Sequence, residues 1–185
     1  MRLDHLAIAA ETLEDGTAWA EAAFGVPFQL GGKHARYGTH NRLLGLEDDL
    51  YIEVIAPDPY GQSDGPRWFG LDTFEGPPRL ANWICEPVDL EEYLRHGMQR
   101  VQMQRGALRW DMGVPPDGSL PMGGGFPTVL SWHTDTPPGQ SLPSSGFALT
   151  RLTINHPQAA AIERDLSDAL DDARIVFEEI GRAHV

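Results

Sequence analysis

The sequence predicts an α+β fold in which two β-α-β-β-β modules are followed by a shorter C-terminal β-α-β segment. Two observations support this prediction. In each half of the chain, several strand-like segments with alternating side chains accompany one helix-like segment. The second half also echoes the first at an offset of 77 residues, which places Leu80 on Leu3 and Leu90 on Leu13. That period is too long for a solenoid and indicates a duplicated module.

Module one spans residues 1–57. It opens with the strand RLDHLAIAA, and the helix that follows is capped by Thr12 and ended by Gly25. Three strand-like segments come next, at roughly 33–38, in HNRLLGL and in LYIEVIAP. The turn EDD joins the last two as a hairpin.

A connection rich in proline and glycine, residues 57–79, follows module one. It contains the adjacent aromatic residues Trp68 and Phe69, which pure linkers rarely carry. We therefore expect an ordered loop that lies against the core.

Module two spans residues 80–134. Its first strand leads into a helix that begins at a capping box from Asp89 to Glu92 and ends at Gly97. Strand-like VQMQ, ALRWDM and PTVLSWH follow, and glycine-rich PPDGSLPMGGG separates the last two.

The tail module, residues 147–178, offers a strand in ALTRLTINHP, a helix in AAIERDLSDAL and a strand in RIVFEE. We expect residues 1–178 to form a single domain. The last seven residues, EIGRAHV (179–185), match one reading frame of a widely used sequencing adapter. We expect these residues to be a non-native C-terminal artefact that makes few packing contacts and leaves an unpaired edge at RIVFEE.

The composition of the chain argues against several classes of binding partner. The net charge of −13 argues against nucleic acid and against an anionic membrane surface. No apolar run approaches the ~20 residues that span a bilayer, and no signal peptide is visible, so we expect a cytoplasmic protein. Cys85 is the single cysteine, which excludes an internal disulfide, and no Cys-His zinc pattern exists. The expected partner is a small-molecule substrate, and a homodimer is compatible with the sequence.

Two polar residues interrupt otherwise apolar strands. Alternation places His5 beside Ala7 on the less bulky face of the first strand. Glu53 lies beside Tyr51 on one face of LYIEVIAP. A buried charge costs free energy unless it is paired or metal-bound. If both strands share a sheet, His5 and Glu53 form half of a divalent metal site with nitrogen and oxygen ligands. The alternative is a His–Glu hydrogen bond that satisfies both groups.

The segments DHLAIAAETLEDGTAWAEAAFGV, GTHNRLLGLEDDLYIEVIAPDP and PRWFGLD resemble the glyoxalase-like branch of the vicinal oxygen chelate superfamily. The resemblance covers essentially the whole chain before residue 179. It implies that the paired modules form an open, curved barrel around a pocket. It also implies that His5 and Glu53, on the first and fourth strands, are ligands of a divalent metal ion such as Zn, Ni, Fe or Mn.

Module two departs from that pattern. The position that matches His5 falls on Asn82 or Trp83. The last strand of module two offers Ser131 and His133 on one face but no carboxylate. A four-ligand site that is symmetric between the modules is therefore not expected.

Several other side chains are candidates for contact with a substrate. His40 and Asn41, in GTHN, are expected to line the pocket, with turn chemistry at a strand start as the alternative. The aromatic candidates are Trp68, Trp83 and Trp110, because an apolar wall suits a small-molecule site.

The sequence gives weaker evidence of a functional role for the arginines and the remaining histidines. Arg67 and Arg109 are the cationic candidates for a substrate carboxylate, with surface solvation as the alternative. Loop or cap roles are expected for His34, His96 and His156.

Two functions stay open at this point. The first is a metal-dependent enzyme, a lyase/isomerase or a dioxygenase, that acts on a small oxygenated molecule. In that case Glu53 is the catalytic proton shuttle and His5 anchors the metal. The second is a metal-free small-molecule binding protein with a resistance or sequestration role, in which aromatic side chains hold a planar ligand. Metal content after mild purification discriminates between them.

Overall fold

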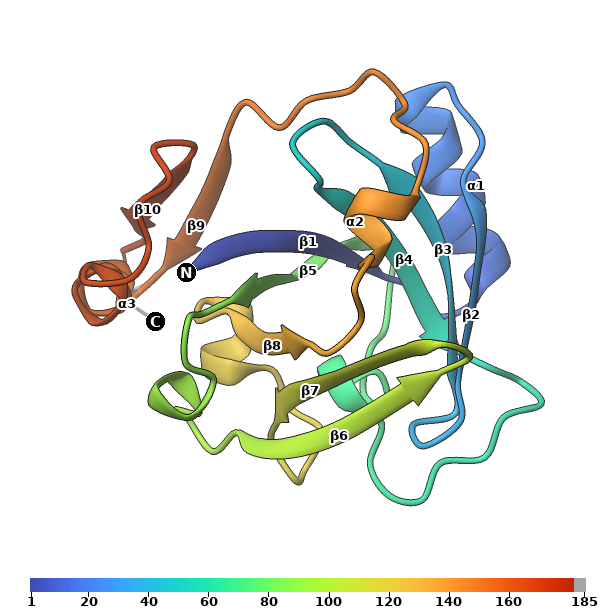
Figure 1. Cartoon of the computed structure of the whole chain (residues 1–185), viewed down its shortest axis with the longest axis horizontal. Coiled ribbons are helices and arrows are strands. Elements are labelled where there is room, and N and C mark those ends of the chain that lie inside the picture. The colour runs from blue at the N-terminus through green and yellow to red at the C-terminus, as the bar shows by residue number, and fades with distance from the viewer. Residues whose placement is uncertain (182–185) are drawn as a thin grey trace.

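The computed structural model describes residues 1–181, and eight of its strands form one curled sheet that makes an open barrel (Figure 1). The strand order is β2-β3-β4-β1-β5-β8-β7-β6. Module one supplies β1 (Arg2–Ala9), β2 (Gln29–His34), β3 (Thr39–Gly45) and β4 (Tyr51–Pro57). Module two supplies β5 (Arg79–Glu86), β6 (Gln99–Arg105), β7 (Leu108–Val114) and β8 (Thr128–Trp132). The predicted α+β fold with a barrel of paired modules is confirmed.

The two modules meet at the centre of the sheet. Strands β1 and β5, which open the two modules, pair antiparallel with each other. Each also pairs in parallel with the last strand of its own module, β1 with β4 and β5 with β8. The order of strands is therefore the same within both modules, as a duplicated unit requires.

Helix α1 (Leu13–Phe24) covers the outer face of module one. The Thr12 hydroxyl accepts a hydrogen bond from the Asp15 backbone N–H at 3.1 Å, and Gly25 ends the helix with a φ of 70°. Both predicted helix boundaries are confirmed. The helix lies close to the sheet, because a Cβ at buried Gly16 would be 2.6 Å from a neighbouring side chain.

The predicted helix from Asp89 to Gly97 is wrong. Only one 3₁₀ turn, η2 (Glu91–Tyr93), forms there. The Asp89 carboxylate accepts from the Glu91 N–H at 2.9 Å, which is a local turn that competes with a helical cap. His96 then takes a φ of 55°, outside the helical region, so no further helical turn forms.

Strand β2 begins four residues before the predicted range of 33–38 and ends at His34. Its centre is Gly31-Gly32, and glycine weakens the sequence signal of a strand. The two glycines are required by packing, because a Cβ at Gly31 would lie 2.0 Å from the Asn41 side chain.

The connection between the modules packs two aromatic side chains into the inner core. It contains η1 (Trp68–Gly70), in which Trp68 and Phe69 are buried and their rings are stacked with centroids 4.9 Å apart. The Tyr37 ring also stacks on Trp68, with the two centroids 4.4 Å apart. The remaining short helical segments are η3 (Pro121–Gly124) and α2 (Pro138–Ser141).

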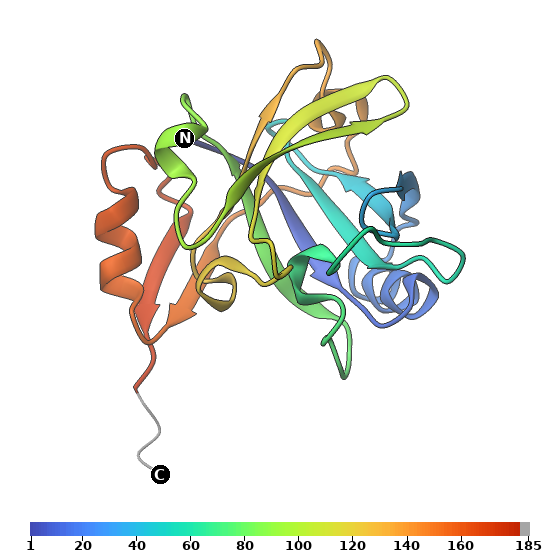
Figure 2. The ribbon, with the colours of Figure 1, turned by 90° about the horizontal axis from the view of Figure 1, so that it is seen from below.

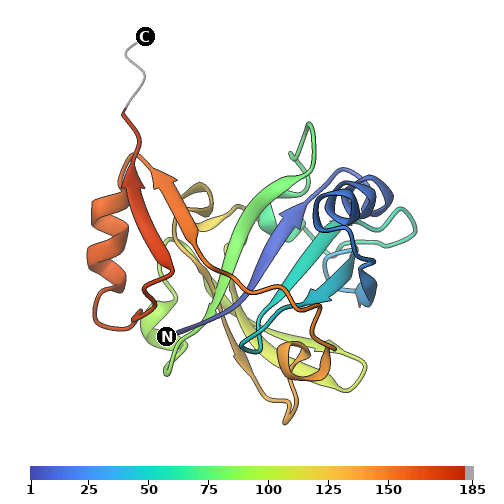
Figure 3. The same cartoon turned by 90° about the horizontal axis from the view of Figure 1, so that it is seen from above.

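The predicted β-α-β tail is present as β9 (Leu152–His156), α3 (Ala159–Leu166) and β10 (Ile175–Glu179). Strands β9 and β10 pair in parallel as a separate sheet. This tail lies on the flank of the barrel opposite α1 (Figures 2 and 3). Of the segment 179–185, residues 182–185 lie outside the described residues, so its origin as an artefact stays a prediction.

The sheet separates two apolar cores. Outward-facing side chains pack with α1 and the tail, whereas inward-facing side chains pack with the aromatic residues of η1 inside the barrel. Along β4, for example, Val54 belongs to the outer core and Ile55 to the inner one. Within residues 1–181, no helix has the length and apolar character that a membrane crossing needs.

Candidate functional site

The inward-facing side chains enclose a cavity of about 30 Å³. This space holds a water molecule or two, since one water needs at least about 10–15 Å³. The polar side chains that line it are His5, His34, Asn41, Glu53 and Arg105. The apolar and aromatic ones are Leu43, Tyr51, Trp68, Phe69, Trp110, Met112, Leu130 and Trp132.

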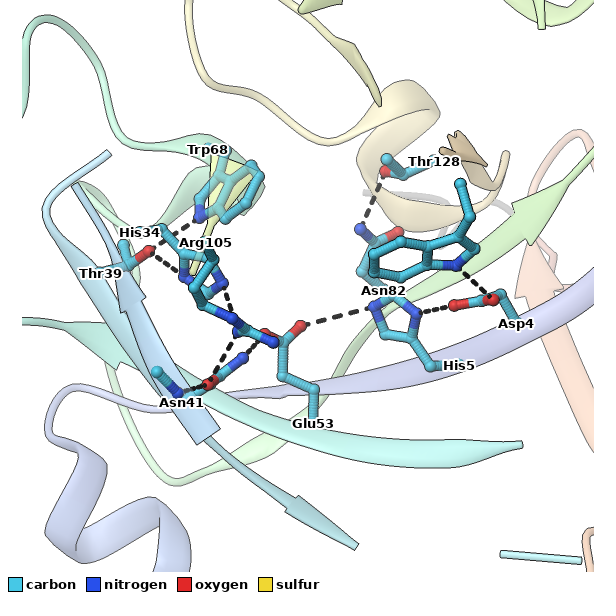
Figure 4. A network of polar contacts seen from close by, with 12 residues as sticks. Asp4, His5, His34, Thr39, Asn41, Glu53, Trp68, Asn82, Arg105 and Thr128 are labelled. Atoms are coloured by element: carbon cyan, nitrogen blue, oxygen red, sulfur yellow. Dashed lines mark hydrogen bonds and ion pairs between the residues drawn. The ribbon is translucent and has the colours of Figure 1, made fainter. Parts of the chain in front are cut away.

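His5 and Glu53 meet inside the barrel, as predicted (Figure 4). Their strands β1 and β4 are adjacent and parallel, with Ala7 opposite Glu53 and His5 opposite Tyr51. The His5 Nε2 lies 3.5 Å from a Glu53 carboxylate oxygen, and the Tyr51 ring stacks on the imidazole with centroids 4.4 Å apart. Alternation on two neighbouring strands is therefore enough to bring this pair together.

Asp4 holds the other side of the imidazole. Its Oδ1 lies 2.6 Å from His5 Nδ1, and its Oδ2 accepts a hydrogen bond from Trp132 Nε1 at 3.0 Å. The pairing of β1 with β5 shifts register between Leu3 and His5, and this irregularity leaves Leu3 in the outer core. Strict alternation would place Asp4 outside the barrel, which is why the sequence did not reveal its contact with His5.

The two carboxylates keep the imidazole charged. Burial disfavours the charged form of His5, but the contacts with Asp4 and Glu53 outweigh it and raise the pKa of the imidazole to about 9. Burial likewise disfavours an ionised Glu53, yet the contact with His5 and a hydrogen bond from Asn41 lower the pKa of this carboxyl to about 2. At neutral pH the buried pair is therefore an imidazolium and a carboxylate.

Asn41 fixes the position of Glu53. Its amide Nδ2 donates to Glu53 Oε1 at 2.5 Å, and its Oδ1 accepts from the Gly32 backbone N–H at 2.7 Å. The same Oδ1 accepts from Arg105 at 3.3 Å. Asn41 thus lines the cavity as predicted, and it links module one to module two.

His34 belongs to this cluster, and the prediction that it is a loop or cap residue is wrong. It ends β2 and is buried. Its Nδ1 lies 3.0 Å from the Thr39 hydroxyl, which also accepts from Trp68 Nε1 at 3.1 Å. Burial lowers the pKa of His34 to about 4, so the ring is neutral and its Nε2 accepts from Arg105 at 3.0 Å.

Arg105, at the end of β6, is the arginine that lines the cavity, rather than the predicted Arg67 or Arg109. Arg67 pairs with Asp72 at 2.7 Å, and Arg109 is exposed. The sheet curls until its edge strands β2 and β6 approach each other, so Arg105 reaches module one across the open seam of the barrel (Figure 4). The alternation of side chains within a strand does not predict such a contact between two sheet edges.

Two predicted pocket residues lie outside the barrel. His40 precedes inward-facing Asn41 on β3, so its side chain faces outward, into a groove beside α1. Trp83 belongs to the outer core and contacts Phe177 of the tail, with ring centroids 6.1 Å apart. The predicted Trp68 and Trp110 do line the cavity, and their contact with a substrate stays a prediction.

The described side chains do not fit a resident metal ion. The 77-residue offset places Asn82 and Leu130 of module two at the positions of His5 and Glu53. Asn82 lies in the barrel and donates to Thr128 at 2.9 Å, and a leucine has no donor atom. Within residues 1–181, no group of three or more His, Cys, Asp or Glu side chains is arranged to hold a metal. Protein metal sites usually have three or four ligands. Here His34 Nε2 and Asn41 Oδ1 already accept from Arg105, so His5 and Glu53 are the two remaining candidate ligands, and they share the cavity with the Arg105 cation.

His133, which the sequence places on the last strand of module two, does not line the cavity either. Its Nε2 lies 2.9 Å from Asp111, and its side chain is half-exposed. Asp111 also pairs with Arg100, so these residues form a separate polar cluster on β6, β7 and the end of β8.

The comparisons with known proteins agree with this architecture. Residues 3–170 match the family model described as a glyoxalase-like domain. No curated protein matches the chain significantly. A solved structure of a hypothetical protein from Staphylococcus aureus is 13% identical, with a TM-score of 0.60 over 89% of this chain and 73% of that one. This likeness extends to the fold alone.

Methylmalonyl-CoA epimerases are also similar in structure. The epimerase from Mycobacterium tuberculosis is 20% identical, with a TM-score of 0.46 over 71% of this chain and 86% of that one. An epimerase from Streptomyces coelicolor is 14% identical, with a TM-score of 0.46 over 73% of this chain and 95% of that one. These overlaps are too low to bear on activity.

Proposed function

Because the chain belongs to the glyoxalase-like domain family, we propose that the barrel interior binds a small oxygen-bearing molecule and does so without a resident metal ion. The observation that supports this most directly is the division between the modules. Module one contributes the hydrogen-bonding side chains His5, Asn41 and Glu53, while Leu130 of module two stands where a second carboxylate ligand would be.

The composition of the cavity suits a binding site for a small planar molecule. Trp68, Trp110 and Trp132 supply flat apolar surfaces, and the polar side chains lie together on the module-one side. Small-molecule sites have this combination of an apolar wall and a few convergent polar groups. A ligand oxygen can accept from Arg105, and a ligand hydroxyl can donate to a remaining lone pair of the Glu53 carboxylate.

The acid–base state of the pair favours binding over proton abstraction. A general base is most effective when its pKa lies near the working pH. The His5 imidazolium holds the pKa of Glu53 at about 2, which makes this carboxylate a weak base at neutral pH. It remains a strong hydrogen-bond acceptor, because it is ionised and buried.

Tryptophan side chains provide the test. Three of the five tryptophans line the cavity, Trp68, Trp110 and Trp132, whereas Trp19 and Trp83 do not. Glycolaldehyde and hydroxyacetone, which are uncharged and small, are titrated into ¹⁵N-labelled protein. We expect a saturable shift of the three cavity indole N–H resonances and none at Trp19 or Trp83. Shifts confined to Trp19 or Trp83, or no saturable shift with either compound, would overturn the proposal.

A second candidate is the metal-dependent enzyme, a lyase/isomerase or dioxygenase. One observation favours it: His5 Nε2 and the Glu53 carboxylate are 3.5 Å apart, which is compatible with both groups binding one ion at ~2 Å. Asp4 also holds His5 Nδ1, as carboxylates often do for metal-bound histidines. Measured metal binding separates the two candidates.

A further inference from the structure

Arg105 carries a positive charge into the cavity without a carboxylate partner, and we infer that the ligand of this site bears a carboxylate that Arg105 binds. The inference rests on the proposed function, because it requires that the barrel is a binding site. It adds the charge and chemical class of the ligand, and it assigns the residue that recognises it.

The contacts of Arg105 leave most of its guanidinium free. Nη1 donates to His34 Nε2 at 3.0 Å and to Asn41 Oδ1 at 3.3 Å, and both acceptors are neutral. Within residues 1–181, no carboxylate oxygen lies within ion-pair distance of Arg105, and its Nε and Nη2 make no hydrogen bond. Two of the donors that form the planar fork of an arginine are therefore unused.

The acidic groups beside the cavity are engaged by other side chains. Glu53 is engaged by His5 on one oxygen and by Asn41 on the other. Asp4 is engaged by His5 and by Trp132. No oxygen of Glu53 or Asp4 lies within ion-pair distance of Arg105, so the guanidinium fork is left to another acceptor.

A carboxylate fits that fork best. Arginine binds carboxylates through two parallel hydrogen bonds, which is stronger and more specific than a contact with a neutral oxygen. A half-buried cation that gains an ionic partner is also relieved of part of its desolvation cost. The chain has a net charge of −13, which repels anions. A cation at this place attracts an anion to the cavity despite that repulsion.

Gly32 provides room for the arginine. A Cβ at residue 32 would lie 2.6 Å from Arg105 Cδ and 3.1 Å from Nε. The φ of Gly32 is not in the left-handed region, so an alanine there meets the arginine side chain rather than backbone strain. Gly32→Ala therefore displaces the guanidinium while it keeps the charge.

Formate and its uncharged analogue formamide test the inference. Each is titrated into ¹⁵N-labelled protein, and the indole resonances of Trp68 and Trp110 report on the cavity. We expect formate to bind at least about tenfold more tightly than formamide. Arg105→Gln should abolish that preference and Gly32→Ala should reduce it. Arg109→Gln, which removes an exposed charge on β7, should leave it unchanged.

Each outcome bears on the inference. Equal affinities for formate and formamide, or a preference that survives in Arg105→Gln, would overturn it. A lack of any saturable formate shift would overturn it as well. The proposed function is judged separately, because glycolaldehyde and hydroxyacetone carry no carboxylate and their binding to the parent protein is measured without reference to formate. If Arg105→Gln does not fold, the folded Gly32→Ala variant decides the result.

Discussion

His5 and Glu53 face each other inside the barrel from neighbouring parallel strands, with 3.5 Å between the imidazole Nε2 and the carboxylate. Asp4 contacts the opposite nitrogen of the same ring at 2.6 Å. The imidazole is therefore enclosed between the side chains of Asp4 and Glu53, and these contacts keep it positively charged. Stability, pH dependence and ligand binding should all depend on this arrangement.

Replacement of His5 by alanine should destabilise the protein. The change leaves the carboxylates of Asp4 and Glu53 buried without the cation between them, at a cost of roughly 1–3 kcal/mol or more. Urea unfolding measures the loss. His133→Ala is the matched control, because that half-exposed imidazole also contacts one carboxylate and should cost less than about 1 kcal/mol. Equal stabilities of His5→Ala and the parent would contradict the pairing.

The stabilising effect of His5 should depend on pH. Its pKa rises from 6.5 to about 9 on folding, so its contribution is complete below pH 6.5 and is lost as the pH rises through 9. The pKa of Glu53 falls from 4.5 to about 2, so its contribution is complete above pH 4.5 and is lost as the pH falls through 2. We predict that the difference in unfolding free energy between the parent and His5→Gln is largest between pH 4.5 and 6.5. A difference that grows above pH 7 would have the wrong sign.

Gly31 should tolerate no side chain. A Cβ there would lie 2.0 Å from Asn41 Oδ1 and 2.8 Å from the Asn41 backbone oxygen, so Gly31→Ala must displace the residue that fixes Glu53. We expect a loss of about 1–3 kcal/mol in urea unfolding. Gly65→Ala is the control, since a Cβ at that glycine meets no atom within 4 Å. Similar stabilities of the two variants would mean that Asn41 is not held against β2.

The Thr39 hydroxyl should be needed to hold the rings of His34 and Trp68 in place beside the cavity. It is the acceptor for His34 Nδ1 and for Trp68 Nε1, and Thr39 is fully buried. Thr39→Val keeps the shape but leaves two buried donors unpaired, at an expected cost of about 1–3 kcal/mol. Thr153→Val, on the tail, removes a hydroxyl whose partner Arg151 is exposed, and it should cost much less. Thermal unfolding of both variants compares the two effects.

The sequence predicts the parts of this site that depend on local periodicity. Alternation along two strands was enough to place His5 and Glu53 on one inner surface, and the 77-residue echo was enough to predict the paired modules. The helix caps at Thr12 and Gly25 are also predictable from the sequence, because a cap depends on a few adjacent residues.

Other parts depend on contacts between distant segments. Arg105 enters the cavity only because the curled sheet brings β6 near β2, and His34 follows two glycines that hide the strand. The register irregularity near Asp4 interrupts the alternation of side chains along β1, so alternation predicts the wrong face for Asp4. For Trp83, both faces of the strand are buried, so hydrophobicity alone does not show which face lines the barrel.

Metal binding is the most direct test of the proposal that the site works without a resident ion. The parent and His5→Ala are purified without chelators, their metal content is measured by inductively coupled plasma mass spectrometry, and Zn²⁺, Ni²⁺, Mn²⁺ and, under anaerobic conditions, Fe²⁺ are titrated by calorimetry. We predict far less than one ion per chain in both proteins and no saturable difference between them. About one ion per parent chain, lost in a folded His5→Ala variant, would contradict the proposal and establish the metal-dependent alternative.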